Sequence, residues 1–309
     1  MGEQHSRIFL TGATGVVGRA LLQRLAGDKR SAGKGMPTVL ALSRNVSAFP
    51  EPGVKAVHGR LSEPDGWRGA LEGVTEVIHM AALTGKAKAS EFERVNVEGT
   101  RTLIEECRCA GVRRFLFVSS IAAKYPELEA YPYGRSKREA ERVVRESGLE
   151  WAIVRPTIVM SRRAKIWHTL EGLAGLPLVP LFGTGQVRIQ PIHADDLAEC
   201  LQTWLEERAY DRGEYDLGGP EVLTFRDFLA RIHRRKRGRQ ARFLRLPGKS
   251  AIALLTPVER LLLPVLPMTA GQFYAFVYDS TAQPNPLAQL HRAKQRDVDA
   301  ILDDLLKYD

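Results

Sequence analysis

The chain has 309 residues, 44% of them apolar, and a formal net charge of +9 at pH 7. This length and apolar content provide the core of one large domain, with or without a smaller lobe. No run of 18 uninterrupted apolar residues occurs, so we expect neither a transmembrane anchor nor a signal peptide. The cysteines are odd in number, and Cys107 and Cys109 would point apart on a helix, which argues against disulfides or structural zinc and favours a cytoplasmic location.

The predicted elements begin with a short strand over residues 7–11 and a helix over residues 16–27 that ends at Gly27. Five more strands are predicted over residues 38–44, 55–59, 76–82, 114–120 and 150–156, with helices between most of them, such as 89–111 and 136–148. Apolar strands that alternate with amphipathic helices indicate a parallel sheet covered on both faces. The sequence therefore predicts an α/β chain with a doubly wound, Rossmann-type sheet.

After Pro156 the regular alternation gives way to segments rich in proline and glycine. We predict a nucleotide-binding domain over residues 1–160, to which a helix at 193–207 returns. Residues 161–309 are expected to form a smaller substrate-binding lobe that closes over the strand ends.

Positive charge is concentrated in residues 231–245, which contain eight Arg or Lys and no acid. A solvated surface segment is the favoured interpretation of such a run. Residues 246–277 follow and are unusually apolar, as expected for a core-packing lobe. The alternative is that residues 231–277 contact an anionic membrane surface, which would make the protein peripheral there, or shape a pocket for a hydrophobic ketone.

A glycine cluster, TGATGVVG, follows the first predicted strand and opens the first helix, with Gly12, Gly15 and Gly18 at G-x-x-G-x-x-G spacing. Such glycines allow a tight turn and a close approach of the backbone to a pyrophosphate at a helix N-terminus. Because strand, turn and helix occur in the required order, a dinucleotide site is favoured over a merely flexible turn.

The end of the second strand carries Ser43 and Arg44 where NAD sites usually place a carboxylate for the ribose hydroxyls. A cation there favours NADP(H) over NAD(H), with Arg19 as a second candidate contact of the 2′-phosphate. The alternative is that Arg44 only begins a solvated loop. The loop HGRLSEP, after the third strand, is expected to flank the adenine.

Two tyrosines in EAYPYGRSKREAERVV are candidate proton donors, but only Tyr133 has a lysine, Lys137, four residues later. That spacing places both side chains on one helix face, where a cation can stabilise a phenolate. The motif is common by chance, but this one opens the helix after the fifth strand, whose end carries Ser119 and Ser120. Ligands of such sheets bind outside those strand ends, so Ser120 is the favoured holder of the substrate oxygen, although strand-end serines often only cap the chain. Tyr131 is left as a candidate pocket wall.

The segments TGATGVVGR, VIHMAA, NVEGTRTLIEECRCAGVRRFLFVSS, YGRSK and VRPTIV resemble the extended or atypical short-chain dehydrogenase/reductase superfamily, which includes NAD-dependent epimerases and dehydratases. The resemblance implies catalytic roles for Ser120, Tyr133 and Lys137. The residues expected to contact the cofactor are Gly12, Thr14, Gly15, Val16, Val17, Gly18, Ser43, Arg44, Leu61, Ala81, Ala82, Lys137 and Pro156.

The second half is more loosely similar to the NADPH-binding accessory subunit of respiratory complex I, in which the cofactor is structural. Two positions depart from the family pattern. Arg60 stands where an aspartate is common, which affects the adenine contact, and Ile121 stands where sugar-modifying relatives carry a third Ser or Thr. Asn96 matches a family asparagine expected to hold a helix and a strand together.

Four histidine and aspartate residues resemble catalytic or metal-binding groups but have structural interpretations. His79 lies on an apolar strand and is expected to be a hydrogen-bonded core residue. His193, with Asp195 and Asp196, fits an N-cap followed by first-turn acids, so we predict no metal.

The leading hypothesis is an NADP(H)-dependent oxidoreductase acting on a small molecule with a carbonyl or hydroxyl group, with Tyr133 as proton donor or acceptor. A second version makes the redox step transient, as in sugar-nucleotide epimerases and dehydratases, but those favour tightly bound NAD. The alternatives from other classes are a non-catalytic NADPH-binding assembly or sensor protein and, supported only by the basic run, a nucleic-acid reader. Pairing of two copies through first-domain helices is compatible with the family.

Overall fold

A computed structural model describes residues 7–27, 38–45, 49, 51, 53–246 and 277–307. Its centre is a parallel sheet of seven strands in the order β11-β6-β5-β4-β1-β2-β3. The strands are β1 (Arg7–Thr11), β2 (Thr38–Ser43), β3 (Val54–His58), β4 (Glu76–His79), β5 (Arg114–Val118), β6 (Glu150–Pro156) and β11 (Glu214–Leu217). The order reverses between β1 and β4, which is the position where doubly wound sheets bind their ligands.

Both faces of the sheet are buried because successive strand residues point to opposite sides. On β1, Leu10 packs in one cluster with Leu21 and Leu197, whereas Phe9 packs in the opposite cluster with Trp67 and Phe115. This two-sided burial explains why the strands consist of almost uninterrupted apolar residues.

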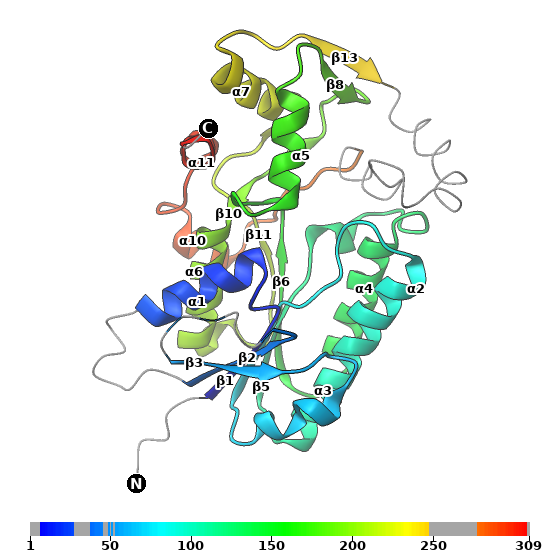
Figure 1. Cartoon of the computed structure of the whole chain (residues 1–309), viewed down its shortest axis with the longest axis vertical. Helices are drawn as coiled ribbons and strands as arrows, with labels where there is room; N and C mark the ends of the chain where they lie inside the picture. Colours follow the sequence, from blue (N-terminus) through cyan, green and yellow to red (C-terminus); the bar gives the residue numbers. More distant parts are fainter. Residues whose placement is uncertain are drawn as a thin grey trace.

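Helices cover the sheet on both sides (Figure 1). The helices α1 (Val16–Gly27) and α6 (Ala194–Glu206) pack against each other on one face. On the other face lie α3 (Gly99–Cys109) and α4 (Pro132–Arg145). A short helix, α2 (Ala89–Phe92), leads into α3 through a π-helical turn at Glu93–Glu98.

A smaller lobe lies beyond one end of the sheet, at the top of Figure 1. Its apolar cluster is built around Trp167, Phe228 and Ile301. The other α-helices of the described ranges are α5 (Lys165–Ala174), α7 (Phe225–Arg237), α10 (Pro286–His291) and α11 (Val298–Leu306), with α10 packed on α6 and β11. Three two-stranded pairs complete the described part: β7 (Val159–Met160) with β10 (Ile192–His193), β9 (Arg188–Ile189) with β12 (Leu223–Thr224), and β8 (Val179–Phe182) with β13 (Phe243–Leu246).

The doubly wound prediction is confirmed, and the first helix and sixth strand have the predicted bounds. The sheet nevertheless has a seventh strand, β11, that the sequence did not predict. Its four residues include Glu214 and Asp216, which break the apolar pattern of a buried strand. The predicted helix at 136–148 begins earlier, at Pro132, because proline suits the first turn of a helix.

Two predictions on individual residues agree with the structure. Cys107 is buried and Cys109 is exposed, as the i,i+2 spacing requires. His193 caps α6, its Nδ1 accepting the Asp195 backbone N–H at 3.2 Å. The helix α6 that follows packs on α1.

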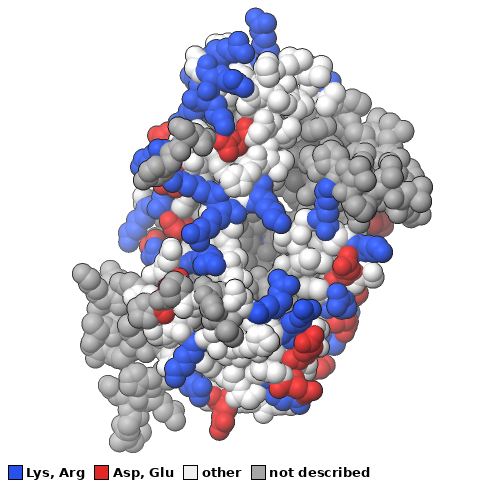
Figure 2. Space-filling model, viewed as in Figure 1, with Lys and Arg blue, Asp and Glu red and all other residues white. Residues whose placement is uncertain are grey.

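The basic segment 231–245 is partly neutralised by acids from other elements. Arg231 pairs with Glu221, Arg235 with Asp299, and Lys236 with Glu171. Figure 2 shows Lys and Arg gathered over the small lobe and across the middle of this face. None of the helices in the described ranges has the length and hydropathy to span a bilayer. Residues 247–276 lie outside those ranges, so membrane contact through residues 231–277 stays a prediction.

Candidate functional site

The predicted site residues lie along one edge of the sheet, at or just beyond the carboxyl ends of its strands. Gly12 follows β1, Arg44 follows β2, Ala81 lies beyond β4, Ser120 lies beyond β5, and Pro156 ends β6. Parallel strands all end at the same edge, so segments far apart in sequence converge there.

The glycine loop lies tightly between its neighbours. A Cβ on Gly18 would lie 2.4 Å from the Gly12 carbonyl oxygen, and a Cβ on Gly12 would lie 2.5 Å from the Ala81 backbone nitrogen. Gly12 also has a φ of +74°, which disfavours other residues. Thr14 and Gly15 are exposed at the tip of the loop, beside the N-terminus of α1. A helix N-terminus that follows a tight glycine loop fits the pyrophosphate of a dinucleotide.

The end of β2 presents a cation, as predicted. Ser43 is buried, and its hydroxyl accepts the backbone N–H of Asn45 at 3.0 Å, which turns the chain. Arg44 is exposed beside this turn. Arg19, on the first turns of α1, donates to the Thr14 carbonyl at 3.2 Å, so it lies against the glycine loop.

Ser120 and Tyr133 meet across the gap between the end of β5 and the first turn of α4. The Ser120 hydroxyl lies beside the Tyr133 side chain and accepts the backbone N–H of Ala122 at 3.2 Å. The close approach depends on Gly134, where a Cβ would lie 3.0 Å from the Ala122 carbonyl oxygen. Burial raises the pKa of Tyr133, and the Ser120 hydrogen bond counteracts this. The phenol is therefore protonated at neutral pH.

Lys137 lies one turn further along α4 and is only 1% exposed. Its Nζ donates to the Val118 carbonyl at 2.8 Å and lies 4.1 Å from the centre of the Phe117 ring. Burial lowers the pKa of Lys137 to about 7, although the nearby Glu141 carboxylate raises it. A buried lysine of this kind can change its charge near neutral pH.

His79 is a structural residue, as predicted from its apolar strand. Burial, assisted by the charge of Lys137, lowers the pKa of His79 to about 3, so the ring is neutral. The Thr100 hydroxyl donates to the Asn96 carbonyl at 2.6 Å, so it accepts from His79 Nε2 at 2.9 Å. His79 Nδ1 then accepts from the Thr11 hydroxyl at 2.6 Å. The imidazole thereby links the end of β1 to the first turn of α3.

Asn96 performs the holding role expected of it. Its side-chain amide bonds both backbone groups of Leu83, at 2.7 and 3.1 Å, and donates to the Ser136 hydroxyl at 2.9 Å. Ser136 in turn donates to the Tyr133 carbonyl at 2.8 Å. The loop after β4 and the first turn of α4 are therefore fixed to each other.

A cavity of about 320 Å³ opens beside Ile121, the residue that follows Ser120. Its wall includes Ile121, Tyr125 and Tyr278, together with Lys124 and Arg188. The two cations are each held by a carboxylate: Lys124 Nζ lies 2.6 Å from Asp216, and Arg188 lies 2.7 Å from Asp279. Tyr131 stacks on Tyr125 at 6.2 Å and contacts Tyr133 at 5.9 Å between ring centres, so an aromatic wall joins the cavity to the predicted proton donor.

The part of the chain that forms this glycine loop and these strand ends matches a known protein family. The model of the NAD dependent epimerase/dehydratase family matches residues 8–218. The chain belongs to this family. It is thus a member of the extended short-chain dehydrogenase/reductase superfamily, in which an NAD(P) nucleotide is the cofactor.

The proteins to which this chain is similar include reductases. The ceramide reductase of Caulobacter vibrioides is 34% identical over 196 residues, which cover 63% of this chain and 59% of that enzyme. The (4-alkanoyl-5-oxo-2,5-dihydrofuran-3-yl)methyl phosphate reductase of Streptomyces griseus is 30% identical over 236 residues, 76% of each chain. The alpha subcomplex subunit 9 of the mitochondrial NADH dehydrogenase of Dictyostelium discoideum is 26% identical over 229 residues, 72% of this chain and 61% of that subunit.

The shared length differs widely among these relatives. The chain spans 23% of an uncharacterized Mycobacterium tuberculosis protein, with 26% identity over 228 residues. In three dimensions, the chain superposes on the crystal structure of gox2253 with a TM-score of 0.74 over 98% of both chains, at 23% identity. That likeness supports the fold alone.

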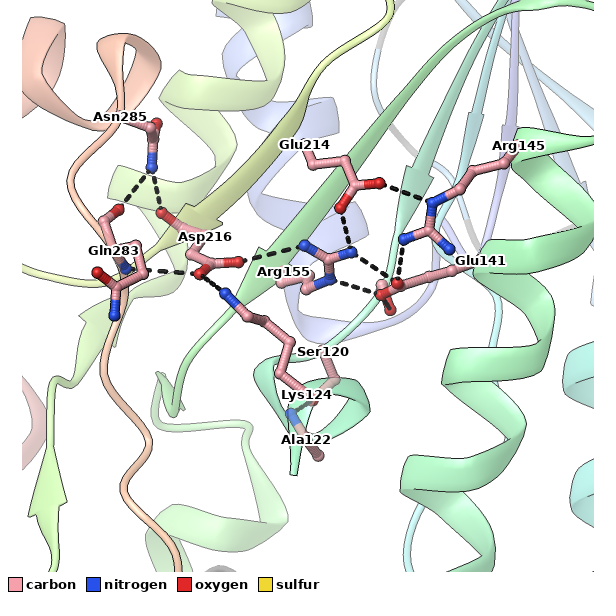
Figure 3. A network of polar contacts seen from close by, with 11 residues as sticks. Ser120, Ala122, Lys124, Glu141, Arg145, Arg155, Glu214, Asp216, Gln283 and Asn285 are labelled. Carbon is pink, nitrogen blue, oxygen red and sulfur yellow. Dashed lines mark hydrogen bonds and ion pairs between the residues drawn. The ribbon is translucent and has the colours of Figure 1, made fainter. Parts of the chain in front are cut away.

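Several charged residues near the site were not predicted from the sequence. Arg155, Glu141 and Asp216 form a buried cluster, which Glu214 joins from the exposed start of β11 and Lys124 from the 3-10 turn Ile121–Lys124 (Figure 3). Glu141 lies in a helix rich in charged residues, yet it is only 3% exposed. The available signal was Arg155 inside the apolar strand EWAIVRP, since a buried arginine requires acidic partners.

Proposed function

We propose that the protein is an NADP(H)-dependent oxidoreductase that transfers a hydride between the nicotinamide and a carbonyl or secondary alcohol. The observation that supports this proposal is the placement of the Tyr133 side chain beside the Ser120 hydroxyl, with Lys137 one helical turn away. This set lies at the same sheet edge as the glycine loop. The reductase names among the relatives agree with a net redox reaction.

Each residue has a defined part in carbonyl reduction. When bound, the reduced nicotinamide supplies the hydride to the carbonyl carbon. Ser120 holds the carbonyl oxygen, and Tyr133 gives that oxygen its proton, so that an alcohol and a tyrosinate result. The Lys137 ammonium stabilises the tyrosinate and holds the nicotinamide ribose.

The cofactor and the substrate occupy different parts of this edge. The glycine loop, with Val16, Val17, Ala81 and Ala82 nearby, would hold the dinucleotide, and Arg44 would contact a 2′-phosphate. The remainder of the substrate would occupy the cavity lined by Ile121, Tyr125 and Tyr278. A small molecule with a carbonyl beside an apolar or aromatic group fits that wall.

A Tyr133→Phe variant tests the proposal against a matched Tyr131→Phe control. NADPH oxidation is followed with a broad panel of carbonyl compounds, and NADH is run in parallel. We expect Tyr133→Phe to reduce kcat by about 10²–10⁴-fold, and Tyr131→Phe to change it much less. Full activity of Tyr133→Phe, or no oxidation by the wild type with any compound, would contradict the proposed reaction.

A non-catalytic role is the second candidate, because the NADH dehydrogenase subunit is among the relatives. Cofactor that copurifies with the protein and never turns over, together with a stable partner protein, would favour that role. Equal rates with NADH and NADPH would refute the preference assigned to Arg44.

A further inference from the structure

Three consecutive residues at the end of β5 face three residues spaced one turn apart on α4. The Val118 carbonyl accepts from Lys137, the Ser119 hydroxyl donates to Glu141, and the Ser120 hydroxyl lies beside Tyr133. The first and last of these contacts belong to the proposed catalytic set. The middle contact, through Glu141, has no part in that reaction.

The Glu141 carboxylate is buried and fully hydrogen-bonded. Its Oε1 accepts from the Ser119 hydroxyl at 2.6 Å and from Arg155 Nε at 2.7 Å. Its Oε2 accepts from a second Arg155 nitrogen at 2.7 Å and from Arg145 at 2.9 Å. Figure 3 shows this carboxylate projecting from α4 toward Arg155. A carboxylate held by four bonds has a fixed position relative to the helix that carries it.

We propose that Glu141 is a positioning residue that keeps the Lys137 ammonium charged and in place beside Tyr133. The part of this proposal that concerns the role of Lys137 in turnover rests on the function proposed above. The part that concerns the effect of Glu141 on the charge of Lys137 does not.

The surroundings of Lys137 explain why one carboxylate matters. Neutral groups face it from the sheet: His79 on β4 and the Phe117 ring on β5. Tyr133 and Glu141 lie one turn before and one turn after it on α4, and Glu141 provides negative charge. Because burial disfavours the ammonium, this charge decides how much of Lys137 is protonated near neutral pH.

The two arginines that bind Glu141 also bind other carboxylates. Arg155 on β6 is shared with Glu214 at 2.6 Å and with Asp216 at 3.5 Å, both on β11. Arg145 is likewise shared with Glu214 at 2.6 Å. Each arginine that binds Glu141 therefore has a second carboxylate, and Glu141, one turn from Lys137, is the cluster member whose charge acts on it.

A Glu141→Gln variant removes the charge at nearly constant volume, and Glu139→Gln is the control because Glu139 is exposed on the same helix and pairs with Arg142. The protein is labelled with ¹³C at lysine Cε, and the Lys137 signal is identified by its loss in Lys137→Met. We expect Glu141→Gln to lower the titration midpoint of Lys137 by at least about one pH unit, whereas Glu139→Gln leaves it unchanged.

An Arg145→Ala variant should shift the titration midpoint of Lys137 in the opposite direction. It can be measured even if Glu141→Gln does not fold. Loss of a cation bound to Glu141 should raise the midpoint of Lys137 by about half a pH unit. A Lys137 midpoint equal to that of the wild type in each folded variant would overturn the proposal.

Turnover separates failure of this proposal from failure of the proposed reaction. In an active enzyme, Glu141→Gln should lose at least about tenfold in kcat/KM at pH 8 and recover as the pH falls, because protonation restores the ammonium. An inactive wild type would refute the reaction, while the lysine titration would still decide the role of Glu141. A uniform loss of activity at every pH, without a shifted titration, would show a structural role only.

Discussion

Two cations are buried at neighbouring strand ends of the sheet, in opposite surroundings. Arg155 lies among Glu141, Glu214 and Asp216, and although burial opposes its charge, the bonds to Glu141 and Glu214 raise its pKa. Burial likewise opposes ionisation of Glu214, but Arg145 and Arg155 lower its pKa to about 2. Lys137 instead contacts a carbonyl and an aromatic ring, and burial lowers its pKa to about 7.

The difference distinguishes a charge that holds elements of the fold together from a charge that takes part in the proposed reaction. Arg155 remains charged at any pH at which the protein is folded, so it can hold α4, β6 and β11 together. Lys137 can lose its proton near neutral pH, which suits a residue that must respond to the charge of a neighbouring phenol. Burial alone does not distinguish these roles, because both side chains are almost inaccessible to solvent.

Replacement of Arg155 should give the largest effect. Arg155→Met leaves Glu141 and Asp216 without their shared partner, and breaking a buried ion pair by removing one member costs about 3–5 kcal/mol. We expect the free energy of unfolding, from urea titration at pH 7, to fall by about that amount. A fall below about 1 kcal/mol would show that the cluster does not hold these elements together.

Replacement of Lys137 should change the free energy of unfolding in the opposite direction and by a smaller amount. Lys137 has a folded pKa of about 7, below its usual value of 10.5, so the unfolded chain binds more protons between these values. The penalty for burying this ammonium is therefore complete below pH 7 and disappears as the pH rises to 10.5. Removing the group should stabilise the fold while abolishing turnover, as expected where function depends on a strained site.

Urea titrations of Lys137→Met at pH 7 and pH 9.5 measure this effect. We expect a gain of about 1–3 kcal/mol at pH 7, reduced by the lost contacts with Val118 and Phe117, and a clearly smaller gain at pH 9.5. A variant less stable than the wild type at pH 7 would mean that Lys137 is held as favourably as Arg155.

The sequence allowed the role of Lys137 to be predicted, but not the cluster around Arg155. The elements of the glycine loop and the Tyr133–Lys137 pair lie close together in the chain, where spacing translates directly into geometry. The Arg155 cluster requires pairing of β6 with β11, about 60 residues later, and β11 has no apolar pattern. Glu141 has the same local sequence context as the exposed acids of its helix, so only packing shows that it is buried.

Arg142 provides the smallest expected effect and tests burial as the deciding variable. It lies on α4, between Glu141 and Arg145, and pairs with Glu139 at 3.2 Å and Glu146 at 3.4 Å. These groups are exposed, so water and salt already screen their interaction. We expect Arg142→Ala to leave the urea midpoint within error of the wild type at low and high salt, and to leave the Lys137 titration unchanged. If Arg142→Ala instead matched Arg155→Met, the number of ion pairs on α4, rather than their exclusion from water, would determine its attachment to the sheet.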